Sequence, residues 1–121
     1  MHELSIAMSL VEQVAQVARE QKAVTVPRIT VTVGQLSGVD PDALRGAFSL
    51  AAEDTAAAGA ELVVDIVEAR VRCRVCGRSS TPTAPFLHCV DCRSTEVEVE
   101  AGRELLIKSI EVDVEVEEKV S

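Results

Sequence analysis

Aromatic side chains are scarce in this chain of 121 residues, which has two phenylalanines, no tryptophan and no tyrosine. Proteins that bind single-stranded nucleic acid usually stack its bases on aromatic rings, and a phosphate backbone repels a chain of formal charge −8. We therefore expect no nucleic-acid partner. The core must be built from valine, leucine, isoleucine and alanine, and a hydrophobic content of 47% is enough for one domain of this length.

Long apolar runs are also missing. No segment is long enough to cross a bilayer. The amino terminus lacks the basic flank of a secretory signal, and Glu12 interrupts the apolar pattern that follows it. The sequence thus predicts a cytoplasmic protein that does not bind membranes. In a reducing compartment, closely spaced cysteines are more often metal ligands than disulfide partners.

The hydrophobic periodicity predicts two helices. Residues 4–22 place apolar side chains at steps of three and four, so that one stripe of the helix, with Met8 in it, faces the core. Asp40 and Pro41 are typical of a helix start, as an N-cap acceptor followed by a first-turn proline. Gly59 is expected to end this second helix in a left-handed conformation.

Alternating apolar and polar residues predict strands. The expected strands cover residues 28–36, 61–71, 96–100 and 104–117, with Pro27 in a connector before the first. A change of phase near Lys108 indicates a bulge or a new packing partner. The order of elements favours an α+β fold, in which a small mixed or antiparallel sheet packs on two helices.

Four cysteines form two C-x2-C pairs with twelve residues between them: Cys73, Cys76, Cys89 and Cys92. Each pair can turn both sulfurs toward one ion, and Gly77 provides a permissive backbone after the first pair. Four thiolates form the closed tetrahedral shell of structural zinc. Residues 71–95 are therefore predicted to be an inserted zinc-ribbon module, whereas 1–70 plus 96–121 form the α+β domain. An iron site of the rubredoxin type and a dithiol redox pair are the alternatives.

The cysteine segment is basic although the chain is acidic. From Arg70 to Arg93 there are five arginines and one aspartate, a formal charge of +4. These arginines can offset the −2 charge of a zinc ion with four thiolates and donate to the sulfurs, or they can form a docking surface for an acidic partner. His88, directly before Cys89, is interpreted as an exposed loop residue, and the alternative is that it tunes the site or transiently replaces a thiolate.

The first three residues, Met1-His2-Glu3, have the pattern of a chelate. The Met1 amine, the backbone nitrogen and ring Nδ1 of His2 and the backbone nitrogen of Glu3 can bind one ion. Four nitrogens favour a square-planar ion, Ni(II) or Cu(II), over zinc. One open site and one closed site indicate a metal carrier and not an enzyme, because four thiolates leave zinc no free position for a substrate.

Three features, in this order, resemble the HypA/HybF family of hydrogenase maturation proteins. They are the start MHELS, the segment from Val33 to Pro41 (VGQLSGVDP) and the paired cysteines. The resemblance implies a nickel metallochaperone that works beside the GTPase HypB. It would deliver Ni²⁺, its cargo, to the large subunit of nickel–iron hydrogenase, and some family members also serve urease.

The resemblance also implies the site residues. Nickel would be bound by Met1, His2 and Glu3, with Asp40 beside them as an additional ligand or as a group that contacts the ligands. A structural Zn²⁺ would be bound by the four cysteines. We expect a monomer or a weak homo-oligomer. The alternative function is a zinc-ribbon protein-interaction adaptor without a transferable metal.

Overall fold

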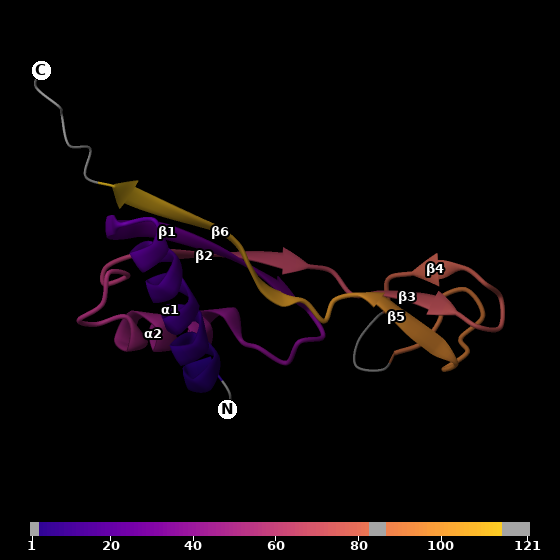
Figure 1. The fold of residues 1–121 in the computed structure, drawn as a ribbon. Coiled ribbons are helices and arrows are strands. Elements are labelled where there is room, and N and C mark those ends of the chain that lie inside the picture. The colour runs from indigo at the N-terminus through magenta and orange to yellow at the C-terminus, as the bar shows by residue number, and fades with distance from the viewer. Residues whose placement is uncertain (1–2, 83–86, 115–121) are drawn as a thin grey trace, which may run out of the picture. The chain divides into compact units, whose positions relative to one another are not determined.

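The structure, a computed structural model, describes residues 3–82 and 87–114 (Figure 1). In chain order the elements are α1 (Glu3–Glu20), β1 (Ala23–Gly34), α2 (Pro41–Ala51), β2 (Glu61–Val67), β3 (Arg70–Cys73), β4 (Ser79–Ser80), β5 (Val97–Ala101) and β6 (Leu105–Val114). The strands form two three-stranded sheets, ordered β2-β1-β6 and β4-β3-β5. In the first sheet β1 and β2 run in the same direction and β6 runs against them, so the sheet is mixed (Figure 1). The predicted α+β class is confirmed.

The chain divides into two compact units. The first comprises Met1–Val31, Val39–Val64 and Ile107–Ser121, and the second comprises Thr32–Gly38 and Asp65–Leu106. The cysteine segment therefore shares its unit with the turn that follows β1. The division predicted from the sequence, with a ribbon module over 71–95, stays a prediction about which residues fold independently.

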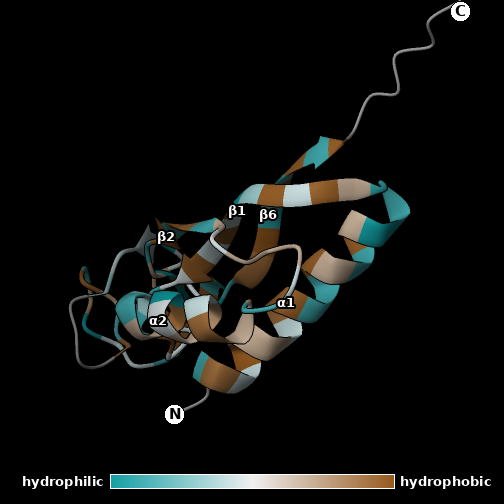
Figure 2. Cartoon of the chain, turned by 90° about the vertical axis from the view of Figure 1, so that its left-hand side faces the viewer, coloured by the Kyte–Doolittle hydropathy of each residue, from teal (hydrophilic) through white to brown (hydrophobic). Residues whose placement is uncertain are grey.

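The core of the first unit lies between the two helices and the first sheet. Both helices lie on one face of that sheet (Figures 1 and 2). Its fully buried larger side chains are Val14, Val26, Ile29, Val31, Leu44 and Phe48. Burying each such side chain contributes roughly 1.5–3 kcal/mol. As predicted, aliphatic residues dominate this core, and no helix within residues 3–82 or 87–114 is long and apolar enough to span a bilayer.

The apolar face of α1 is narrower than the sequence predicts. Ala7, Val14 and Ala18 are buried, whereas Leu4 is 50% exposed and Met8 is 59% exposed. The prediction that Met8 lies in the core is therefore wrong. At 100° per residue, Leu4 and Met8 fall at the margin of the stripe that contacts α2 and the sheet.

Two element boundaries differ from the prediction. β1 begins at Ala23, so Pro27 lies inside the strand and not in a connector. The fixed φ of proline fits an extended chain, and the strand loses only one donor there. α2 ends at Ala51, with Ala52 as its C-cap, and Gly59 adopts a left-handed φ of +76° only after several further turns. Gly59 therefore precedes β2 and does not end the helix.

The later strands are partly as predicted. Residues 61–71 form β2 and β3, which belong to different sheets, and not one strand. β5 agrees with the short strand expected over 96–100. In β6 the half-buried residues are Ile107, Ile110 and Val112, so the burial pattern shows the expected change of phase near Lys108. The end of the predicted strand, 115–117, lies outside the described residues.

Candidate metal centre

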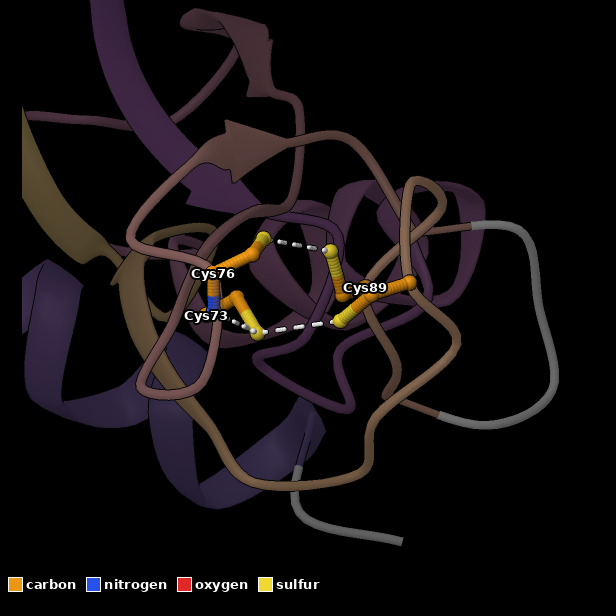
Figure 3. A group of neighbouring side chains, drawn as sticks. Cys73, Cys76 and Cys89 are labelled. Carbon is orange, nitrogen blue, oxygen red and sulfur yellow. Dashed lines mark hydrogen bonds between the residues drawn. The ribbon is translucent and has the colours of Figure 1, made fainter.

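The sulfur atoms of the four cysteines converge on one point in the second unit (Figure 3). All four lie within 4.8 Å of one another. Two hydrogen-bond contacts join the pairs: Cys73 Sγ lies 3.5 Å from Cys92 Sγ, and Cys76 Sγ lies 3.6 Å from Cys89 Sγ. The first cysteine of each pair is buried and the second is exposed. This arrangement can hold one metal ion, with one side of the site open to solvent.

The first cysteine pair is folded by backbone hydrogen bonds. The N–H of Cys73, the last residue of β3, donates to the carbonyl of Arg78 at 2.9 Å. The N–H of Gly77 donates to the carbonyl of Cys73 at 3.0 Å. Inside this turn, the N–H groups of Val75 and Cys76 donate to Cys73 Sγ at 3.3 and 3.4 Å. The sulfur is therefore held by backbone donors before any metal binds.

The second pair repeats the same bonds at the same spacing. The N–H of Cys89 donates to the carbonyl of Ser94 at 2.9 Å, and the N–H of Arg93 donates to the carbonyl of Cys89 at 2.8 Å. Arg93 has a φ of 64°, and Gly77, at the equivalent position of the first turn, has 77°. The permissive backbone of Gly77 was expected from the sequence, whereas Arg93 was considered there only for its charge. Counting one residue past the second cysteine of each pair would have found both.

The four thiols have different pKa values. The backbone N–H of Cys76 makes the largest contribution to lowering the pKa of Cys73, which falls to about 6. Chiefly through the backbone N–H of Cys92, the pKa of Cys89 is also lowered. The N–H of Ser94 acts to lower the pKa of Cys92, but the Cys73 sulfur, desolvation and the other two sulfurs outweigh it and raise that pKa to about 12. The buried cysteines are thus the first to become thiolates.

Acidic residues of β5 lie beside the basic segment. β3 pairs antiparallel with β5 and places Arg72 opposite Glu98. Arg74 forms an ion pair with Glu98 at 2.8 Å. Within the part of the chain that the structure describes, no arginine donates to a sulfur, so the expected arginine–sulfur bonds are replaced by backbone ones. The positive charge counted along residues 70–93 is partly balanced by a strand that follows it in sequence.

His88 lies in the loop directly before Cys89 and is half-buried, not exposed as expected. The interpretation as an exposed loop residue is therefore wrong, and the alternative is that His88 tunes the site or transiently replaces a thiolate. Its role stays a prediction.

The residues of the expected nickel site are only partly within the structure. Met1 and His2 lie outside the described residues. Glu3 is the first residue of α1 and is half-buried. Asp40 is the N-cap of α2, as predicted: its Oδ1 accepts from the N–H of Asp42 at 3.0 Å and from the next N–H at 3.4 Å. The nickel-binding roles of these four residues stay predictions.

Comparison with known proteins adds a family. Residues 1–112 match the model of a family described as "Hydrogenase/urease nickel incorporation, metallochaperone, hypA". Hydrogenase maturation factor HypA of Chlorobaculum parvum is 42% identical over 113 residues, which is 93% of this chain and all of that protein. The namesake protein of Dehalococcoides mccartyi is 40% identical, covering 93% of this chain and 95% of its own.

The fold has known counterparts too. The solution structure of the Ni metallochaperone HypA from Helicobacter pylori matches with a TM-score of 0.67 and 26% identity, over 95% of this chain and all of that one. A second solution structure, of a HypA protein, matches with a TM-score of 0.65 and 28% identity, over 95% of this chain and 98% of that one. Sequence and fold thus agree on one family.

The pKa values predict how many protons a metal displaces. At pH 7 Cys73, with a pKa of about 6, is mostly thiolate, whereas Cys92, with a pKa of about 12, is a thiol. Loading zinc onto metal-free protein at pH 7 should therefore release fewer than four protons, because each ligand must bind as a thiolate and Cys73 has already lost its proton. At pH 5 Cys73 is protonated too, so the number should rise toward four. Calorimetry in buffers of different ionisation enthalpy measures it, and a constant value across this range would contradict the assignment.

The two equivalent turns predict opposite effects of paired substitutions. Gly77→Ala puts a Cβ on a left-handed residue, which costs roughly 1–2 kcal/mol and should weaken metal binding about tenfold. Arg93→Gly removes the same strain from the second turn and should strengthen binding. Arg93→Asn is the control for the lost charge, since asparagine tolerates this conformation. Competition with a chromophoric chelator measures the affinities; equal values for wild type and Gly77→Ala would show that the turn geometry is not limiting.

Proposed function

Because the chain belongs to the HypA family of nickel metallochaperones for hydrogenase maturation, we propose that it binds Ni²⁺ at its own amino terminus and delivers this ion to a nickel–iron hydrogenase. The observation that carries the proposal is the family match over residues 1–112, which includes the start MHE. It acts as a carrier and catalyses no reaction. HypB and the large hydrogenase subunit are its proposed partners, and a reducing cytoplasm keeps its thiols free for metal.

The proposed nickel ligands are consecutive along the chain. They are the amine of Met1, the backbone nitrogen and ring of His2, and the backbone nitrogen of Glu3. Backbone amides bind nickel only after losing a proton, so the affinity should fall as the pH drops. Ligands at a terminus can also be detached one after another, which suits transfer of the ion to a partner.

Asp40 can assist this site while it caps α2. Both capping hydrogen bonds use Oδ1, and in the described part of the chain Oδ2 has no hydrogen-bond partner. One oxygen is therefore available to a cation or to a nickel ligand. We propose that Asp40 stabilises the bound nickel from this position.

The four cysteines are proposed to hold a resident Zn²⁺. Support comes from their mutual separations, all within 4.8 Å, and from the backbone donors that orient Cys73 Sγ. When bound, the ion links two turns that have little apolar core of their own and so stabilises the second unit. The cysteine site thus has a structural role, whereas the amino-terminal site binds the nickel that is transferred.

His2→Ala should weaken Ni²⁺ binding at least tenfold. The substitution removes the imidazole Nδ1, which is one of the four proposed nitrogen ligands, and with it one chelate ring. Extending the chain by one residue before Met1 should have the same effect, since it converts the amine to an amide. Equilibrium dialysis of untagged protein measures nickel, and elemental analysis should find one zinc in every variant. Nickel affinity that is unchanged in both variants would refute this site. One zinc with no specific nickel binding in the wild type would favour the adaptor function instead.

Asp40 has two separable roles. Asp40→Ala should lower the free energy of unfolding by about 1 kcal/mol through loss of the cap. Asp40→Asn keeps a good cap and removes only the charge. We expect Asp40→Asn to unfold like the wild type in urea but to bind Ni²⁺ several-fold more weakly. If nickel affinity in Asp40→Asn equals that of the wild type, Asp40 is a cap alone.

A further inference from the structure

The ladder between β3 and β5 has the cysteines at one end only. Cys73, opposite Val97, closes one end of the pairing, and Arg70, opposite Ala101, closes the other. The register shifts between Arg70 and Val71. Ladders open from their ends, and irregular pairing is the weaker starting point. A metal bound to the cysteines can stabilise the end of the ladder at Cys73. The end at Arg70 must therefore be stabilised by other contacts.

Those contacts come from a distant part of the sequence, the last residue of β1 and the turn that follows it. Three backbone hydrogen bonds join this turn to the segments just before β3 and just after β5: Gln35 N–H to Val67 O (2.9 Å), Leu36 N–H to Gly102 O (2.6 Å) and Gly34 N–H to Glu104 O (2.7 Å). We name this set of seven residues the linker clamp: Gly34, Gln35, Leu36, Val67, Ala69, Gly102 and Glu104. All seven belong to the second unit.

Two side chains complete the linker clamp. Gln35 Oε1 accepts from the N–H of Ala69 at 2.8 Å, and Ala69 is only 4% exposed. Glu104 Oε1 accepts from the N–H of Gly102 at 2.6 Å. Ala69 directly precedes β3 and Gly102 directly follows β5. Each of the two residues that border the weak end of the ladder thus has its backbone donor satisfied.

At Gly34 and Gly102 the neighbouring backbone is too close for either residue to have a side chain. A Cβ on Gly34 would lie 2.0 Å from the carbonyl oxygen of Gly102, and a Cβ on Gly102 would lie 2.8 Å from the Cα of Ala69. Neither contact can be relieved by turning a side chain, because the atoms met are backbone. The three segments are therefore in direct main-chain contact.

We propose that the linker clamp keeps the far end of the β3–β5 ladder closed and thereby slows the release of zinc from the cysteines. This proposal rests on the zinc assignment made above. When the linker clamp opens, the ladder can separate from Arg70 toward Cys73, which lies three residues further along β3. Once β3 leaves β5, Cys73 moves away from the sulfur of Cys92 and one ligand is lost. Gln35 is thus a positioning residue that contacts no metal.

The test compares zinc release from the full-length protein in excess chromophoric chelator. Gln35→Met keeps the length of the side chain and removes the acceptor, and it should speed release about fivefold, the effect of one typical hydrogen bond. Gln35→Glu retains an oxygen for the N–H of Ala69 and should release zinc at close to the wild-type rate. Gln13→Met, on the exposed side of α1, is the matched control and should change nothing.

Hydrogen exchange separates this role from general destabilisation. In Gln35→Met the amides of Ala69 and β3 should lose protection while those of α1 keep it. Loss of protection throughout the chain would refute a local role for Gln35. A wild type that binds no zinc would refute the zinc assignment, whereas one zinc with equal release rates in wild type and Gln35→Met would refute only this inference.

Discussion

The second unit depends on the convergence of four sulfur atoms on one point. Two short turns, alike in their backbone hydrogen bonds, bring the sulfurs of Cys73, Cys76, Cys89 and Cys92 within 4.8 Å of one another. Thiolates this close repel one another unless a cation lies among them. In the metal-free protein the backbone N–H of Cys76 lowers the pKa of Cys73, whereas for Cys92 the neighbouring sulfurs and desolvation outweigh the N–H of Ser94 and raise the pKa. The metal ion proposed for this site would order a segment with few aliphatic residues, because metal binding supplies folding free energy that a small hydrophobic core does not.

The two ends of the β3–β5 ladder illustrate two ways of closing a small sheet. At the cysteine end, a short turn is held by hydrogen bonds between neighbouring residues, including backbone N–H groups that donate to the sulfur of Cys73. At the other, glycines and the amide of Gln35 bring together three segments that are far apart in sequence. The segment VGQLSGVDP, which resembles the family's own pattern, therefore has a structural use here: its glutamine and first glycine brace the cysteine unit, and its aspartate caps α2.

The two proposed metal sites differ in their chemistry in a way that suits a carrier. Sulfur ligands from two distant turns form a closed shell that is slow to exchange, which suits a resident ion. The nitrogen ligands proposed for the amino terminus would form an open and detachable set, which suits a cargo. The chain belongs to a family of nickel metallochaperones for hydrogenase maturation, for which the proposed cargo is nickel. The acidic first unit and the partly neutralised basic segment would place the two proposed sites in different electrostatic surroundings.

Local patterns determined much of this protein from sequence alone: α1 and α2, the Asp40 cap, the strand around Ile29 and the cysteine spacing all depend on neighbours within a few residues. Tertiary structure decided what depends on distant partners. It exposed Met8, since the width of a buried stripe is set by what packs on it. It gave the Arg74 guanidinium a carboxylate from β5, and it placed Gln35 on Ala69, thirty-four residues away. The sequence does not indicate which distant backbone group a single glutamine side chain will bind, because that hydrogen bond forms only once the strands have assembled.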